Sequence, residues 1–290
     1  MFGVQMSTLK NRIRELGPFA TLQRCAEIGY PSVEISQIAM TTENVAEIKR
    51  AADDFDITIA ALSAALEPMI AGMKGETLAS NFDKIVEDCK TLNCSMLRIG
   101  ILPMTCLAGR ENAMGFIARA EEMATRLKVE HDIELYYHNH HVEFVRYDGE
   151  YLLDLFRKHT KQLGFELDIH WIYRGGEDPV SYIPHFNGRA RLLHLKDYRI
   201  GAVKVPDGPF DPASFMRAFT NVVEFAEVGE GSLPVKACID AGIAAGSEFF
   251  LIEQDETYGR DEFESLRISK ENLVKLGYGD WFERRPGGRP

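Results

Sequence analysis

The sequence predicts an α/β protein built as a (β/α)8 barrel, and three observations support this fold class. Short apolar runs alternate with longer amphipathic segments from end to end, which is typical of βα units around a parallel sheet. There are eight such runs in 290 residues, and a TIM barrel of eight strands needs about 250 residues. Several runs also end in polar residues, as strands do at the mouth of such a barrel.

The eight apolar runs are the expected strands, at residues 2–5, 32–35, 57–62, 95–101, 133–138, 164–169, 189–196 and 249–253. Helical spacing of apolar residues predicts helices at 19–28, 42–55, 76–92, 112–130, 150–158 and 261–276. Asp178 and Pro179 are typical of a further helix start. We therefore expect a single TIM-barrel domain over residues 1–290, with an irregular C-terminal tail from about residue 277.

Composition and charge narrow the classes of function. The net charge of −11 argues against nucleic-acid binding and against binding to an anionic membrane surface, because both need a basic face. We found no apolar stretch of about 18 residues and no signal peptide at the N-terminus, so we expect a cytoplasmic protein. The five cysteines form no CxxC pair, which favours reduced thiols. A small-molecule substrate fits this composition best. Whether the protein forms a homo-oligomer is left open by the sequence.

Residues 135–144, LYYHNHHVEF, begin as a buried strand and end in residue types that bind metals. His138, His140, His141 and Glu143 follow the apolar part directly, and all eight histidines of the chain lie between His131 and His194. A single histidine would suit a polar turn or a satisfied core position. A group of three histidines and a glutamate at a strand end instead predicts a site.

The next three predicted strands end in Asp168, His194 and Glu253. In a closed barrel these ends lie around one mouth, so the three side chains and one from strand five could bind one ion. Carboxylates with imidazole suit Mn²⁺, Mg²⁺, Co²⁺ or Zn²⁺. Taken singly, Asp168 could cap a helix, His194 could be a core histidine, and Glu253 could pair with Arg199.

Six motifs together resemble the xylose isomerase-like TIM barrels, specifically the sugar phosphate isomerase/epimerase group, over residues 3–273. They are YHNHHVEF (137–144), LDIHWIYRGGEDPVSYI (167–183), GRARLLHLKDYR (188–199), VGEG (228–231), IEQDE (252–256) and SLRISKENL (265–273). The resemblance implies a divalent ion held by a strand-five residue, Asp168, His194 and Glu253, with substrate oxygens completing its coordination.

The sequence departs from the family pattern at strand five. The ketose epimerases of this superfamily have a glutamate where this chain has His138. Either His138 binds the ion itself, or Glu143 folds back to supply a carboxylate. The change also affects the two-glutamate mechanism of those epimerases, in which His138 or His140 could replace one acid–base group here.

The implied chemistry is proton abstraction next to a carbonyl, with a metal-stabilised enediolate, in an isomerase or epimerase acting on a keto sugar or sugar derivative. Glu253 would be the base and His140 a further acid–base candidate. Lys196 lies two residues beyond His194 and could donate to a substrate oxygen; otherwise it is a surface lysine paired with Asp197. Trp171, Tyr173 and Phe210 could stack on a sugar.

Three other hypotheses about the function remain. A lyase would form the same intermediate and expel a leaving group, as inosose dehydratase relatives or lyases of 3-keto-glycosides do. An apurinic endonuclease shares the barrel, but its substrate requires a basic face that the net charge of −11 does not favour. A non-catalytic sugar-binding protein would need no metal.

Overall fold

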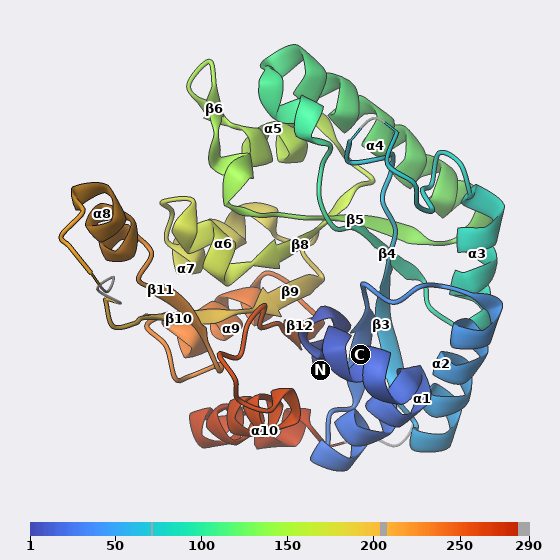
Figure 1. Cartoon of the computed structure of the whole chain (residues 1–290). Helices are drawn as coiled ribbons and strands as arrows, with labels where there is room; N and C mark the ends of the chain where they lie inside the picture. The colour runs from blue at the N-terminus through green and yellow to red at the C-terminus, as the bar shows by residue number, and fades with distance from the viewer. Residues whose placement is uncertain (71, 204–207, 284–290) are drawn as a thin grey trace.

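The structure is a computed structural model that describes residues 1–70, 72–203 and 208–283. Its centre is a closed barrel of parallel strands in the order β1-β12-β9-β8-β5-β4-β3-β2 (Figure 1). These strands are β1 (Phe2–Gln5), β2 (Ser32–Ile35), β3 (Thr58–Ser63), β4 (Met96–Ile99), β5 (Glu134–His138), β8 (Gly164–Asp168), β9 (Leu192–Leu195) and β12 (Phe249–Ile252). All eight expected strands are present, and the predicted (β/α)8 barrel is confirmed.

Helices connect the strands, as a parallel sheet requires. They are α1 (Lys10–Ile28), α2 (Thr42–Phe55), α3 (Phe82–Thr91), α4 (Arg110–His131), α5 (Leu152–His159), α6 (Ile169–Arg174), α7 (Pro179–Tyr182), α8 (Pro212–Thr220), α9 (Val235–Ala244) and α10 (Glu262–Leu273). Helix α2 begins at the expected Thr42, capped by the Thr41 hydroxyl, which accepts from the Asn44 N–H. Helix α7 begins at Pro179, with Asp178 as its N-cap.

Some elements differ from the prediction or were not predicted. Helix α1 begins at Lys10 rather than residue 19, and α3 begins at Phe82 rather than residue 76. Further elements were not predicted from the sequence: α6, α8, α9 and the hairpins β6–β7 (Arg146–Tyr147 and Glu150–Tyr151) and β10–β11 (Asp197–Ile200 and Val223–Ala226). Figure 1 shows α8 at the edge of the molecule beyond β10 and β11, on the side opposite α2 and α3.

The barrel interior has an apolar end and a polar end. Alternation along each strand points Leu192 and His194 to one face of β9, and Phe249 and Leu251 to one face of β12. The apolar members belong to a small buried cluster comprising Ala60, Ala61, Met96, Tyr136, Leu192, Phe249 and Leu251. A much larger apolar cluster contains residues of the outer helices. The polar residues of the interior lie toward the carboxyl ends of the strands.

Part of the tail expected from residue 277 is ordered against the barrel. Tyr278, Trp281 and Phe282 have their rings 5.9, 5.6 and 4.9 Å from the ring of Phe2. This aromatic group covers the start of β1. Residues 284–290, which hold the rest of the tail, lie outside the described residues.

The five cysteine thiols are buried and free of disulfides, as expected. Over the described ranges, no helix combines the length and apolarity needed to cross a lipid bilayer.

Candidate metal centre

Four side chains from four consecutive barrel strands meet at the carboxyl ends of those strands. His138 and Asp168 are the last residues of β5 and β8, His194 lies in β9, and Glu253 directly follows β12. One potential ligand atom from each lies within 4.8 Å of the other three, and all four residues are buried. The barrel therefore brings together two imidazoles and two carboxylates that are up to 115 positions apart in sequence, from 138 to 253. We call these four residues the ligand cluster.

Two atoms of the ligand cluster are buried without hydrogen-bond partners among the described residues, although one of them, Asp168 Oδ2, lies 3.7 Å from the Lys196 ammonium. In the described part of the chain, neither the Nε2 atom of His138 nor the Oδ2 atom of Asp168 has a hydrogen-bond partner, and the two atoms are 3.7 Å apart. The Nδ1 atom of His194 lies 3.8 Å from the same Asp168 oxygen. Unpaired buried polar atoms are unfavourable, and a cation between them would satisfy both. The donor set thus fits a divalent ion.

The protonation state of His138 suits a ligand. Burial lowers its pKa well below the usual value, and the neighbouring His194 and Arg98 act in the same direction. The imidazole is therefore neutral near pH 7, which is the form that binds metals.

Hydrogen bonds hold the two carboxylates of the ligand cluster in place. The Oε1 atom of Glu253 accepts from Gln5 Nε2 at 2.9 Å and from Ser7 Oγ at 3.1 Å. The Oδ1 atom of Asp168 accepts from the Trp171 N–H at 2.9 Å, so Asp168 is also the N-cap of α6. In each case one oxygen is fixed by the protein while the other faces the cluster. Such support is typical of metal sites.

Lys196 lies at the edge of the ligand cluster and is only 1% exposed. Its Nζ atom lies 2.8 Å from Glu253 Oε2 and 2.9 Å from Asp255 Oδ2. Burial alone would lower the pKa of Lys196, but the surrounding carboxylates raise it above the usual value. The alternative of a surface lysine paired with Asp197 is wrong, because Asp197 instead accepts backbone N–H groups from Gly229, Gly231 and Leu233.

Glu143 lies outside the ligand cluster. Its carboxylate accepts from the Tyr137 hydroxyl at 2.6 Å and from the His140 N–H at 2.7 Å. Burial raises the pKa of Glu143 to about 7, although both hydrogen bonds oppose that shift. In this arrangement Glu143 fixes the turn after β5, and His138 is the strand-five residue that faces the other ligand types.

His140 lies next to the ligand cluster, with its ring 4.7 Å from that of His138. It is the N-cap of the 3-10 turn His141–Phe144, and its N–H donates to the Glu143 carboxylate. Burial, reinforced by His138, lowers the pKa of His140, so its imidazole is neutral near pH 7.

A charged layer lies beneath His194, inside the barrel, and the sequence analysis missed it. It consists of Glu34 in β2, Arg98 in β4 and Glu166 in β8, all buried. The Nε2 atom of His194 is 2.9 Å from Glu34 Oε2 and 3.1 Å from Glu166 Oε1. The sequence shows a charged residue inside each of three expected strands, but not that the three meet in the barrel.

The three aromatic candidates do not gather at one place. Trp171 lies near the cluster, with its ring 5.6 Å from His140 and 5.0 Å from Lys196 Nζ. Tyr173 packs against Tyr198. Phe210 is 77% exposed and contacts Phe215 beside α8. The structure thus brings only Trp171 to the ligand cluster. Phe225 of β11, which was not predicted, also lies there, 5.6 Å from Lys196 Nζ.

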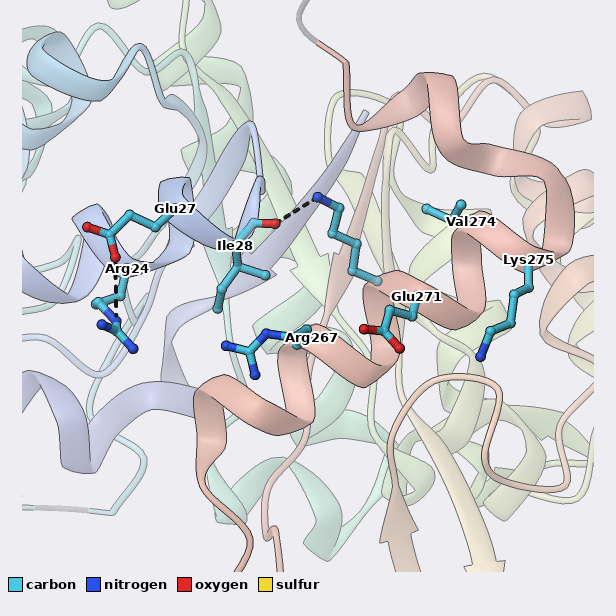
Figure 2. Close-up of a pocket in the computed structure, with 8 residues that line it drawn as sticks. Arg24, Glu27, Ile28, Arg267, Glu271, Val274 and Lys275 are labelled. Atoms are coloured by element: carbon cyan, nitrogen blue, oxygen red, sulfur yellow. Dashed lines mark hydrogen bonds and ion pairs between the residues drawn. The ribbon is translucent and has the colours of Figure 1, made fainter.

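The structure also has a surface cavity of about 690 Å³ on the outer helices, between α1 and α10 (Figure 2). Arg24 and Glu27 line it from α1, where they pair at 3.7 Å. Lys270 lines it from α10 and donates to the Ile28 carbonyl. Its lining residues belong to the outer helices and not to the ligand cluster, so the cavity does not bear on the candidate site.

Solved structures with the same fold have several different functions. Two sugar phosphate isomerase/epimerase structures from Parabacteroides distasonis are similar to this chain. One has 19% sequence identity and a TM-score of 0.74, and the match covers 96% of this chain and 98% of that one. The other has 22% sequence identity and a TM-score of 0.65, and the match covers 95% of this chain and 93% of that one. A probable 3-DHS dehydratase involved in petrobactin synthesis in Bacillus anthracis has 12% identity and a TM-score of 0.67 over 94% and 98%. These low identities show a shared fold alone.

The family assignment comes from the sequence match. No functionally curated protein matches the chain. The family model of the xylose isomerase-like TIM barrels matches residues 22–269, which contain all four residues of the ligand cluster. The chain therefore belongs to the xylose isomerase-like TIM barrel family.

Proposed function

We propose that this protein is a divalent-metal-dependent enzyme that removes a proton next to the carbonyl of a keto sugar or sugar derivative, as an isomerase or epimerase. The single observation that carries the proposal is the ligand cluster at the barrel mouth, in which, among the described residues, His138 Nε2 and Asp168 Oδ2 have no hydrogen-bond partner. The two imidazoles in the donor set favour Mn²⁺, Co²⁺ or Zn²⁺ over Mg²⁺. Bound there, the ion would act as a Lewis acid that stabilises negative charge on substrate oxygens.

Glu253 is better placed to hold the ion than to accept the proton. Its Oε1 atom already accepts from Gln5 and Ser7, and its Oε2 atom faces Lys196 and His194. Burial would raise the pKa of Glu253, but Lys196 and His194 lower it well below the usual range, which weakens the carboxylate as a base.

We therefore propose His140 as the group that takes the proton, with Glu253 as the alternative. The His140 imidazole is neutral near pH 7 and adjoins the cluster. Its backbone is fixed by the Glu143 carboxylate, which keeps the ring beside His138. Burial lowers the pKa of His140 as well, to about 2, so basicity does not separate the two candidates. The preference for His140 rests on geometry: its Nδ1 atom has no hydrogen-bond partner among the described residues, whereas both oxygens of Glu253 have partners.

Lys196 is proposed to hold a substrate oxygen. Its ammonium is fixed between Glu253 and Asp255 and remains charged at neutral pH. A buried cation beside the reacting carbonyl would favour the negative charge that develops on that oxygen when the neighbouring proton leaves.

The second candidate is a lyase or dehydratase. It begins with the same proton abstraction, so it uses the same residues, and the probable dehydratase from Bacillus anthracis shares the barrel over 94% of this chain. The two candidates differ only in whether a leaving group departs. An endonuclease role fits less well with the net charge of −11.

Mass spectrometry of keto sugars and 3-keto-glycosides incubated in D₂O tests the proposal. Manganese-loaded protein should introduce one deuterium at the carbon next to the carbonyl, and chelator should stop this exchange. An isomerase or epimerase would return a product of unchanged composition, whereas a lyase would release a smaller fragment or water. Deuterium uptake that persists in chelator would contradict the metal-dependent mechanism.

A further inference from the structure

The interior of a (β/α)8 barrel is normally filled by branched apolar side chains, but here three buried charged residues occupy one level of it. Glu34, Arg98 and Glu166 come from three different strands. Arg98 pairs with Tyr136, two residues before His138, and Glu166 stands two residues before Asp168, so both lie beneath these members of the ligand cluster. Burying charges is unfavourable unless they are paired and hydrogen-bonded. We therefore expect the charged layer to have a specific role in the protein.

The geometry of the layer converges on one nitrogen atom. His194 presents Nδ1 to the ligand cluster, 3.0 Å from Glu253 Oε2, and Nε2 to the charged layer. Glu34 Oε2 lies at hydrogen-bond distance from Nε2, and Arg98 Nε donates to Glu34 Oε1 at 2.5 Å. Arg98 also contacts Glu166 Oε2 at 3.1 Å and Ser36 Oγ at 3.1 Å.

This arrangement determines which nitrogen of His194 keeps its proton when an ion binds. A carboxylate oxygen can only accept, so the Glu34 contact requires a proton on Nε2, and the Glu253 contact at 3.0 Å requires one on Nδ1 as long as no ion is bound. A divalent ion in the ligand cluster would take the place of the Nδ1 proton, which leaves the lone pair on Nδ1 and the proton on Nε2. Metal-binding histidines commonly have their second nitrogen fixed by a carboxylate in this way.

We propose that Glu34, held in place by Arg98, is a positioning residue that fixes His194 as the Nε2–H tautomer and so directs Nδ1 to a divalent ion. The inference rests on the proposed metal site and specifies how the protein prepares one of its ligands. Glu34 acts through His194 and has no contact with the substrate in this scheme.

Glu34→Gln is a sharp test because it keeps the shape and reverses one hydrogen bond. The Arg98 Nε–H requires an acceptor, so the amide oxygen will turn toward Arg98 and the NH₂ group toward His194. An NH₂ donor facing Nε2 disfavours the proton there and leaves Glu166 Oε1, 3.1 Å away, as the carboxylate oxygen that can still accept it, so the Nε2–H form is weakened. Glu227→Gln is the matched control, since Glu227 is equally buried and paired with Arg260 at 2.7 Å, outside the ligand cluster.

The experiment uses the full chain and Zn²⁺, which is diamagnetic. Isothermal titration measures the Kd for Zn²⁺, and long-range ¹H–¹⁵N NMR of the histidine rings identifies the protonated nitrogen of His194. We expect Zn²⁺-loaded wild type and Glu227→Gln to carry the proton on Nε2, and Glu34→Gln to bind Zn²⁺ about 10- to 100-fold more weakly.

The outcomes separate this inference from the proposed function. A folded Glu34→Gln variant with wild-type Zn²⁺ affinity would overturn the inference while leaving the metal site intact. Should that variant not fold, the spectrum of Zn²⁺-loaded wild type decides alone: a proton on Nδ1 of His194 and none on Nε2 would overturn the inference. Failure of the wild type to bind Zn²⁺ would overturn the proposed metal site, and the role of Glu34 with it.

Discussion

The two halves of the barrel contribute differently to the candidate site. Strands β5, β8, β9 and β12 supply the ligand cluster, whereas the strands from β1 to β4 supply none of its four members. Yet Gln5 at the end of β1 donates to Glu253, and Glu34 in β2 contacts His194. The first half therefore supplies hydrogen-bond partners for Glu253 and His194, which belong to the second half.

The difference between the halves shows how closure of the barrel brings residues that are distant in sequence into one site. Because β1 pairs with β12 and β2 pairs with β1, side chains from the first strands reach the last strands across the interior. Ligand types at strand ends can be found by reading the sequence near each apolar run. The residues that hydrogen-bond to these ligands cannot be found in this way. Glu34 and His194, for example, are 160 positions apart and meet only when the barrel closes.

The largest expected effect comes from removing two members of the ligand cluster. The double variant Asp168→Ala with His194→Ala should retain no stoichiometric metal, because half of the donor set is lost. Elemental analysis of protein purified without chelator checks this against a double variant of two exposed residues, His185→Ala with Asp211→Ala. Full metal content in the first double variant would place the ion elsewhere.

A second prediction separates ligand from base within the mouth. His140→Asn should lower the D₂O exchange rate on the order of 10² to 10⁴, the usual contribution of a general base, with the Kd for Mn²⁺ little changed. Glu253→Gln should instead weaken Mn²⁺ binding. The opposite pattern, with exchange abolished by Glu253→Gln and kept by His140→Asn, would make Glu253 the base.

The first half of the barrel should matter for stability through Arg98. Arg98→Met leaves Glu34 and Glu166 buried without their shared cation, so it should lower the free energy of unfolding by about 3–5 kcal/mol. Urea denaturation measures the change. Arg119→Met removes an exposed pair with Glu67 and should change the free energy by less than about 1 kcal/mol. Equal effects would mean that the charged layer does not stabilise the barrel.

Ser7→Ala should have the smallest effect. It removes one hydrogen bond to Glu253 Oε1 at 3.1 Å and leaves the bond from Gln5. Loss of one such bond, worth about 1 kcal/mol, corresponds to roughly a fivefold weaker binding of Mn²⁺. Titration with Mn²⁺ measures it; an unchanged Kd would show that Gln5 alone holds Glu253.

Much of the fold could be predicted because each strand is a local apolar run. The first two expected strands, 2–5 and 32–35, coincide with β1 and β2. The strand ends at Asp168, His194 and Glu253 were equally visible, since polar residues directly follow apolar ones there.

Helices α8 and α9 both escaped prediction. Helix α8 buries none of its described residues, whereas α9 buries Val235, Cys238 and Ile239, so burial alone does not decide which helices the sequence reveals. The choice between His138 and Glu143 was also open in sequence, because His138 ends β5 and Glu143 comes five positions later. In the structure, a hydrogen bond from the Tyr137 hydroxyl holds Glu143 away from the ligand cluster.

The central claim, that one divalent ion binds among His138, Asp168, His194 and Glu253, is tested most directly by anomalous X-ray diffraction from crystals grown with Mn²⁺. The account predicts one strong anomalous peak per protomer in contact with these four side chains. A peak between Glu34 and Glu166 instead, or no peak in the barrel at all, would contradict it.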